Sequence, residues 1–327
     1  STLNAELRAV AVTELRIMVL EPAILYLGIR LLARQTSDVW RIVDFWLAGA
    51  LLVAAVGLWQ AATGQGLVLA EGGAQRILSI YGSPNNVGLY LGRLLPVALA
   101  VGLLGNPNRW RRWGYAVAVL PLAVAIVLSR SRGALILGVP AALTMILIGW
   151  KGRKVGWSLV GLGVTAVITA VLARSDPRLH QLFNRSTGAT FFRLNLWQST
   201  LQMIREHPWT GVGLDNFLYA YRGRYIAPAA WQDPNLSHAH NWLLDYAARL
   251  GIPGLAVALL LLGTTVWQAW HTLKRQKDPA LRALVLGLLA SLAHFLSHGL
   301  VDASYWFVDL AFATMLTLGL LQVLATF

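Results

Sequence analysis

The stretch SHAHNWLLDYAARLGIPGLAVALLLLGTTVWQAW, from Ser237 to Trp270, joins a polar segment to a long run of apolar residues. Between residues 242 and 270 the only charged side chains are Asp245 and Arg249. An α-helix needs about 20 mainly apolar residues to cross the hydrocarbon core of a bilayer. The stretch therefore predicts a membrane-spanning helix with two histidines and an asparagine at its edge.

The rest of the 327-residue chain has the same character, because 57% of its residues are hydrophobic and only 13% are charged. Soluble domains carry about 25% charged residues. Transmembrane β-strands would alternate over segments of about ten residues, and the sequence shows no such pattern. We predict an all-α polytopic membrane bundle. Its roughly nine expected segments are 17–33, 42–62, 87–105, 114–129, 134–150, 155–172, 242–270, 280–299 and 307–326.

The basic residues predict the orientation of these segments. All four lysines lie in the short loops KGRK and HTLKRQK, and NPNRWRRW adds three arginines. Short basic loops stay in the cytoplasm, which places residues 173–241 outside. We expect N-terminal transmembrane helices over 1–172, a large external loop over 173–241 and C-terminal transmembrane helices over 242–327. An external start suggests that further helices precede residue 1.

Composition also limits the possible ligands. Basic topology loops carry much of the net charge of +13, so we predict no nucleic-acid partner. The chain has no cysteine, which excludes disulfides and thiolate metal sites.

The external loop contains FFRLNLWQSTLQMIREHP, whose apolar residues recur at helical spacing. We predict an amphipathic helix over about 191–206, ended by Pro208. Arg193 would then lie near the first turn, where free backbone N–H groups favour an anion. Two partners are open for Arg193: a phosphate ligand, or a salt bridge to Asp176 or Asp215.

The stretch LSRSRGALI places Arg130 and Arg132 between two predicted membrane helices, at the external end. They could extend to lipid head groups or point inward as functional groups. Arginine's planar fork binds phosphate with two hydrogen bonds.

His238 and His240 are candidates for acid–base chemistry, because an unperturbed imidazole can accept a proton from an alcohol at neutral pH. In an extended segment the two rings would face opposite ways, so we expect them not to share a ligand. We predict no metal site, because the sequence offers neither cysteine nor a neighbouring acid at ligand spacing. The alternative is a pair of polar interfacial residues. His294, His298 and Asp302 are expected to serve packing.

The spacing His240-Asn241, nine residues, Gly251, two residues, Gly254 resembles the H-[NSQ]-x9-G-x-x-[GTY] pattern of the O-antigen ligase and polymerase superfamily. Three further stretches resemble the family in the same order along the chain: GSPNNVGLYLGRLLP, SRSRGALI and RLNLWQSTLQMIREHPWTGVGLDNF. The resemblance extends from about residue 75 to the end.

This resemblance implies a GT-C-type glycosyltransferase in the bacterial inner (plasma) membrane, with its site on the periplasmic face. The donor would be an undecaprenyl-pyrophosphate-linked glycan, and the acceptor a hydroxyl on a glycan, lipid or protein, as in lipopolysaccharide assembly. No metal or other cofactor is implied. His240 would be the catalytic base, while Arg132 and Arg193 would hold the pyrophosphate. Arg130, His238 and Asn241 are further candidates for substrate binding.

Two points stay open. Many members carry a glutamate where this chain has Arg249, which could alter handling of the acceptor. Members usually have about a dozen helices, consistent with further helices before residue 1. The alternative function is a transporter of bicarbonate or another small anion, because a basic external surface attracts anions. A transporter would place polar groups near the bilayer midplane, whereas these cluster at one face.

Overall fold

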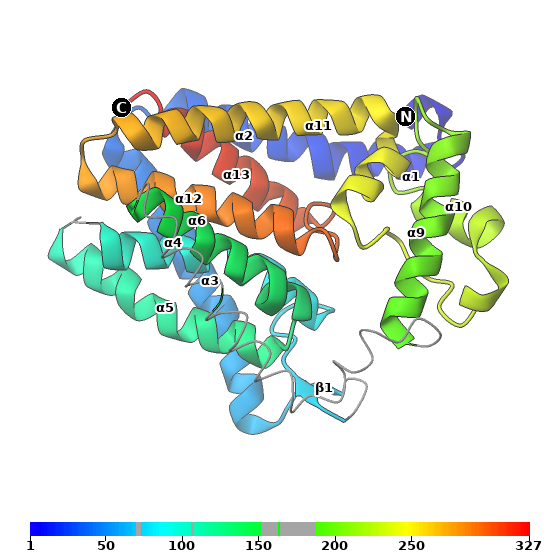
Figure 1. The fold of residues 1–327 in the computed structure, drawn as a ribbon, viewed down its shortest axis with the longest axis horizontal. Helices are drawn as coiled ribbons and strands as arrows, with labels where there is room; N and C mark the ends of the chain where they lie inside the picture. Colours follow the sequence, from blue (N-terminus) through cyan, green and yellow to red (C-terminus); the bar gives the residue numbers. More distant parts are fainter. Residues whose placement is uncertain (70–72, 106–107, 152–162, 164–187) are drawn as a thin grey trace. The chain divides into compact units, whose positions relative to one another are not determined.

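The computed structural model describes residues 1–69, 73–105, 108–151, 163 and 188–327, and almost all its regular structure is helical (Figure 1). The predicted segment 155–172 and the first part of the external loop, 173–187, lie outside the described residues. A short antiparallel pair joins β1 (Val68–Leu69) to β2 (Gln75–Arg76). The longer helices are α1 (Arg8–Glu14), α2 (Glu21–Leu32), α3 (Thr36–Thr63), α4 (Pro84–Leu99), α5 (Arg109–Ser129), α6 (Val139–Lys151), α9 (Gly188–Glu206), α11 (Trp242–Arg275), α12 (Pro279–His298) and α13 (Val308–Leu324).

Short helical turns continue several of these elements. They are η1 (Thr2–Asn4), η2 (Leu15–Leu20), η3 (Ala100–Leu104), η4 (Gly133–Gly138), α10 (Phe217–Ala220), η6 (Tyr221–Tyr225) and η7 (Pro228–Ala230).

Among the described residues, six helices are long and apolar enough to cross a membrane. They are Thr36–Thr63, Pro84–Leu104, Arg109–Ser129, Gly133–Lys151, Trp242–Arg275 and Pro279–His298. They confirm six of the predicted segments, and α13 is a shorter apolar helix within the predicted 307–326. The predicted segment 17–33 contains α2, which is not among the six. The chain is thus an all-α, multi-pass membrane protein.

The chain divides into two compact units. We call Ser1–Leu25, Ala173–Thr264 and Gly299–Phe312 the loop unit, because it contains the described part of the loop that the sequence predicts to be external. We call Tyr26–Leu172, Thr265–His298 and Ala313–Phe327 the bundle unit.

The bundle unit is built around α4 and α12. In each of their apolar windows 78% of the residues are buried, and α12 packs on α4 and α6. Glycine permits this approach: a Cβ added at Gly287 would lie 2.8 Å from the Cα of Val97, and one at Gly102 would lie 2.6 Å from the backbone nitrogen of Ala116. Small residues at helix contacts are typical of membrane bundles.

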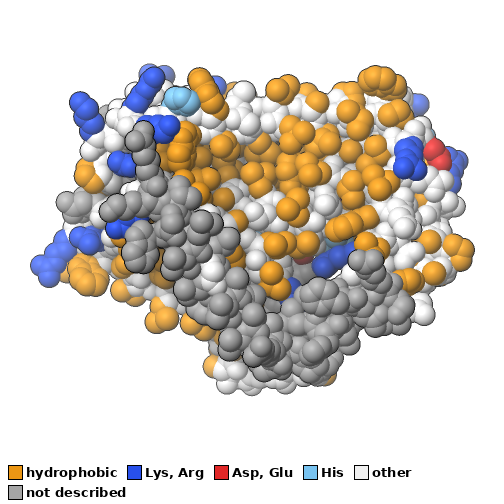
Figure 2. Space-filling view, in the orientation of Figure 1, with side chains coloured by type: hydrophobic (Ala, Val, Ile, Leu, Met, Phe, Trp, Pro, Cys, Tyr) orange, Lys and Arg blue, Asp and Glu red, His pale blue; other side chains and the backbone are white. Residues whose placement is uncertain are grey.

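The outer surface of α11 is apolar, as expected of a lipid-facing helix. Its exposed hydrophobic side chains are Ile252, Val257, Leu259, Leu260, Leu261 and Trp267. Figure 2 shows hydrophobic side chains along this helix, with Lys and Arg side chains gathered toward its end. A membrane removes the cost of exposing such a surface to water.

The loop unit has its own hydrophobic core. The predicted helix 191–206 is confirmed as α9, which ends at Glu206, just before Pro208. Leu196 and Met203 of α9 pack with residues from α10 and η6, including Phe217 and Tyr221. The apolar rows of α9 therefore bury side chains within the loop unit itself.

Candidate active site

His240 lies just before α11, and its imidazole contacts Asp302 from the segment between α12 and α13. The Nδ1 atom of His240 is 3.1 Å from Oδ1 of Asp302. An ionised carboxylate can only accept hydrogen bonds, so the ring donates through Nδ1–H and its Nε2 keeps the lone pair. The Asp302 side chain is 6% exposed and that of His240 is 21% exposed. The carboxylate is thus buried, whereas the ring can still meet a substrate.

The rings of His238 and His240 lie together, which corrects the expectation that they face opposite ways. Their centroids are 4.2 Å apart and their planes meet at 64°. Side chains alternate only in extended backbone, and His240 has a φ of +48°. This left-handed conformation, which costs a non-glycine residue about 1–2 kcal/mol, turns the His240 ring toward His238.

His238 is half-buried between the rings of His240 and Phe307, whose centroid lies 5.6 Å away. Separation from water lowers the pKa of His238 to about 3, and the charges of His240, Arg249 and Arg193 act in the same direction. His238 is therefore neutral at pH 7, and Arg193 lies close enough to influence it electrostatically.

Asn241 fixes the start of α11. Its Oδ1 accepts hydrogen bonds from the backbone nitrogens of Leu243 and Leu244, at 3.0 and 3.2 Å. Its Nδ2 donates to the carbonyl of Leu300 at 3.1 Å. The amide therefore serves as a helix cap and ties α11 to the segment that carries Asp302.

Helix α9 is attached to the same stretch, Ser237–Asn241, which we call the histidine segment. The indole Nε1 of Trp197 donates to the carbonyl of Ala239 at 2.9 Å. Arg193 lies one turn before Trp197, on the same side of the helix. Because α9 begins at Gly188 rather than near residue 191, Arg193 lies beyond the first turn, and the predicted assistance from free N–H groups does not apply. Within the described part of the chain Arg193 makes no salt bridge to Asp215; Asp176 is not described.

Arg249, one turn after Asp245 on α11, is the centre of a buried ionic network. Its Nη1 donates to both carboxylate oxygens of Glu14, at 2.7 and 2.9 Å. Its Nε donates to Oδ1 of Asp245 at 3.1 Å, and its Nη2 to the carbonyl of Ser237 at 2.6 Å. Burial raises the pKa of Glu14 to about 7, against the lowering effect of the guanidinium.

This network positions the histidine segment from both sides. Arg249 holds the carbonyl before His238, and Asp245 accepts a hydrogen bond from the backbone nitrogen of Ala239 at 3.4 Å. Arg249 thus places a cation on α11, and α1 supplies a carboxylate to it.

The two glycines of the His-Asn pattern have distinct packing roles. Gly251 has a φ of +73° and interrupts α11; a Cβ there would lie 2.5 Å from the carbonyl carbon of Trp209. The backbone nitrogen of Ile252 donates to the carbonyl of Pro208 at 2.7 Å. A Cβ at Gly254 would lie 2.2 Å from that of Leu250. Gly251 therefore lets the turn after α9 approach α11, whereas Gly254 leaves room for the Leu250 side chain within α11.

Arg130 and Arg132 belong to the bundle unit, in the turn from α5 to η4. Arg130 is exposed and ends α5 with a φ of +48°, while Arg132 is half-buried and immediately precedes η4. Ser131 between them is fully buried, and its Oγ lies 3.4 Å from Nε2 of His298. A Cβ at Gly88 of α4 would lie 2.8 Å from that of Ser131, so two of the family-like stretches pack against each other.

Sequence reasoning missed two residues of this arrangement. Asp302 was expected only to pack, yet it contacts His240 across 62 positions of the chain. Glu14 contacts Arg249 across 235 positions. Charge in a largely apolar sequence was the one available signal, but it does not identify the partner.

The site could also hold a cation. His238, His240 and Asp302 each offer a ligand atom, and these atoms lie within 4.8 Å of one another. This corrects the expectation that no acid lies near the histidines. Two histidines and a carboxylate form a donor set found in zinc enzymes. In this geometry the His240 Nδ1–H is used by Asp302, so Nε2 is the nitrogen of this ring that keeps a lone pair.

Comparison with known proteins finds one family that part of the chain is similar to. Residues 116–259 match the family model described as O-Antigen ligase. A search of curated proteins finds no match. The matched range contains the arginine turn of the bundle unit, α9 and the histidine segment at the start of α11. Residues 116–259 are therefore similar to the O-antigen ligase family.

Proposed function

We propose that the chain is a membrane glycosyltransferase that transfers a glycan from an undecaprenyl-pyrophosphate carrier to an acceptor hydroxyl at the external face of the bacterial inner membrane. The observation that carries this proposal is the His240–Asp302 pair, which leaves Nε2 of His240 unused. The family match and the membrane helices support the same reaction class.

In the proposed reaction, Nε2 of His240 accepts the proton of the acceptor hydroxyl. The hydroxyl oxygen bonds to the anomeric carbon as the bond from that carbon to the pyrophosphate oxygen breaks, and the lipid pyrophosphate leaves. A single displacement from the opposite face inverts the anomeric centre. Asp302 keeps the ring in the required tautomer and stabilises the imidazolium that forms.

The leaving pyrophosphate needs positive charge, which we assign to arginine instead of a metal ion. Arg193 is the best supported, because it lies one turn before Trp197, whose indole donates to the carbonyl of Ala239. Arg132, with the adjacent Arg130, immediately precedes η4, where a helix start also favours an anion. His238 orients the His240 ring, and Asn241 positions it through the start of α11.

The test uses the protein in liposomes with a lipid-pyrophosphate oligosaccharide donor and a panel of acceptors, in EDTA. His240→Ala should lower transfer by about 10²–10⁴-fold, the usual contribution of acid–base catalysis, with donor binding retained. Arg193→Lys should raise KM for the donor, because lysine lacks the fork. His271→Ala, at the other end of α11, is the matched control and should transfer normally. Equal transfer by all variants would contradict the assignment, and loss of transfer in EDTA would contradict metal independence.

Asp302→Asn gives a second, independent prediction. The amide cannot stabilise an imidazolium as a carboxylate does, so kcat should fall by at least about tenfold, the equivalent of one pKa unit. KM for the donor should change little, since Asp302 does not reach the substrate. The pH profile of kcat in the variant should shift to lower pH relative to the wild type. An unchanged profile would show that Asp302 serves only packing.

One observation favours the alternative, an anion transporter. Arg93 of α4 and His294 of α12 are both 0% exposed, inside the bundle unit, and buried ionisable groups within a membrane often mark transport pathways. The same liposomes decide the matter, because uptake of labelled bicarbonate that requires Arg93, in the absence of glycan transfer, would replace the transferase proposal.

A further inference from the structure

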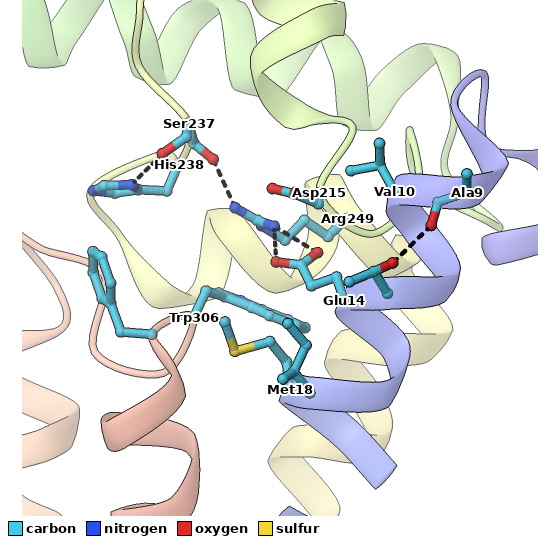
Figure 3. Close-up of a pocket in the computed structure, with 12 residues that line it drawn as sticks. Ala9, Val10, Glu14, Met18, Asp215, Ser237, His238, Arg249 and Trp306 are labelled. Carbon is cyan, nitrogen blue, oxygen red and sulfur yellow. Dashed lines mark hydrogen bonds and ion pairs between the residues drawn. The ribbon is translucent and has the colours of Figure 1, made fainter. Parts of the chain in front are cut away.

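A pocket of about 400 Å³ opens beside the histidine segment, within the loop unit. Figure 3 shows Glu14 and Arg249 meeting at its centre, with His238 on one side and the side chains of α1 on the other. Twelve residues line it: Ala9, Val10, Thr13, Glu14, Ile17, Met18, Asp215, Ser237, His238, Arg249, Trp306 and Phe307. The volume accommodates a sugar ring, and His238 connects it to His240.

The polar groups of the pocket offer acceptors rather than donors. Arg249 is the pocket's guanidinium, and its Nε, Nη1 and Nη2 all donate to protein oxygens. Glu14, Asp215 and the adjacent Asp245 surround this one positive charge. Among the described residues, the Asp215 carboxylate accepts no hydrogen bond. A pyrophosphate would meet a guanidinium that is already paired, whereas hydroxyl groups would find carboxylate oxygens.

The opposite wall is aromatic. The Trp306 ring lies with its centroid 5.1 Å from the Arg249 guanidinium carbon, and Phe307 follows it in the lining. Met18 from η2 extends this apolar side (Figure 3). Rings of this kind offer flat apolar surface beside polar groups, which suits a hexose with apolar C–H faces and a rim of hydroxyls.

We propose that this pocket binds a neutral hexose of the acceptor glycan and presents its hydroxyl to the histidine segment. The proposal rests on the proposed transferase function and extends it by separating the two substrates. The anionic donor group belongs with the arginines outside the pocket, and the acceptor belongs with Glu14, Asp215 and the aromatic wall. Arg249 then contributes by holding Glu14 in place and by neutralising part of the charge on the carboxylates around it.

The test fills the pocket without changing its ionic network. Ala9 and Thr13 are exposed positions of α1 that line the pocket, and Val12 is exposed on the same helix but does not line it. Ala9→Trp and Thr13→Trp should each block binding, while Val12→Trp is the control for an added indole. Binding is measured on the full chain in detergent, by saturation-transfer NMR with methyl glycosides of glucose, galactose and mannose, without donor.

Wild type and Val12→Trp should bind at least one of these methyl glycosides, and both filled variants should bind it at least about tenfold more weakly, equivalent to about 1.4 kcal/mol. Inorganic pyrophosphate should not displace it. The proposal is overturned if no glycoside binds, if the filled variants bind normally, or if pyrophosphate competes.

The same variants separate this proposal from the transferase function. If wild type binds the sugar, the filled variants do not, and no variant transfers glycan, the pocket stands and the transferase proposal fails. If transfer proceeds with unchanged acceptor KM in Ala9→Trp and Thr13→Trp, the transferase stands and the pocket assignment fails.

Discussion

Arg249 in the loop unit and Arg93 in the bundle unit are both buried arginines, 2% and 0% exposed, yet their surroundings differ. Arg249 meets two carboxylates and a backbone carbonyl that come from three separate stretches of the chain. Arg93 lies with its guanidinium carbon 4.4 Å from the centroid of the Phe295 ring, on a neighbouring helix. Charge pairing connects distant segments in the loop unit, whereas a ring contact joins Arg93 of α4 to Phe295 of α12 in the bundle unit.

The difference matches the purpose of each unit. The loop unit must hold histidines on irregular backbone, and hydrogen bonds to a guanidinium fix such backbone in direction as well as distance. The bundle unit consists of regular helices whose backbone groups are already paired. The positions of these helices relative to one another therefore depend on side chains that fit into spaces left by glycine.

The largest expected effect comes from breaking the ionic network. Arg249→Met leaves Glu14 and Asp245 buried without their cation, which should lower the free energy of unfolding by about 3–5 kcal/mol. Arg16→Met removes an exposed pair with Glu21, whose side chains are 67% and 42% exposed, and should cost about 0–1 kcal/mol. Denaturant unfolding in detergent micelles measures both.

A further variant sharpens this test. Replacing Glu14 by Met together with Arg249→Met removes two of the three charges and should recover part of the loss. If Arg249→Met were no more destabilising than Arg16→Met, the network would not stabilise the loop unit.

The next effect concerns packing in the bundle unit. A Cβ at Gly92 would lie 2.0 Å from Nε2 of His294, so Gly92→Ala should cost about 1–3 kcal/mol by overpacking. Adding His294→Ala should relieve the clash, which gives a non-additive pair. Gly28→Ala is the matched control, because nothing lies within 4 Å of its added Cβ; it should stabilise α2 by roughly 0.5–1 kcal/mol. Thermal unfolding of Gly92→Ala, His294→Ala, the double variant and Gly28→Ala measures these effects. If the effects of Gly92→Ala and His294→Ala were additive, the two side chains would not be in contact.

Much of the bundle unit could be predicted from sequence, because apolar length reports membrane helices directly. The helix α9 was predictable for a similar reason, since helical spacing and Pro208 mark its body and its end. The prediction placed the first residue of α9 near 191, whereas the helix begins at Gly188. The apolar spacing used for the prediction does not mark where the helix starts.

The candidate site was less predictable, because its geometry depends on one backbone angle and on distant partners. The positive φ of His240 brings the two histidine rings together. Histidine adopts this conformation more often than most residues, but too rarely for the sequence to predict it. The partners Asp302 and Glu14 lie far away in sequence. The pattern His-Asn-x9-Gly-x-x-Gly identified the residues, but only the fold shows that Gly251 serves the approach of the turn after α9.

The smallest expected effect is the pH dependence of the loop unit. The folded chain lowers the pKa of His238 to about 3, whereas histidine in an unfolded chain has a pKa of about 6.5. Between these values the unfolded chain binds more protons, so acidification below about pH 6.5 favours unfolding. For one half-buried group, the free energy of unfolding should fall by about 1 kcal/mol between pH 7.5 and pH 5.5.

His238→Asn should flatten this dependence, because asparagine does not titrate, while His271→Asn at the far end of α11 should leave it unchanged. Denaturant unfolding at the two pH values measures the difference for each variant. An equal acid-induced loss in the wild type and His238→Asn would assign the pH dependence to another group. A flatter dependence in His238→Asn alone would show that the folded loop unit keeps the His238 imidazole neutral beside His240. The burial of this neutral ring would then lower the stability of the loop unit in acid.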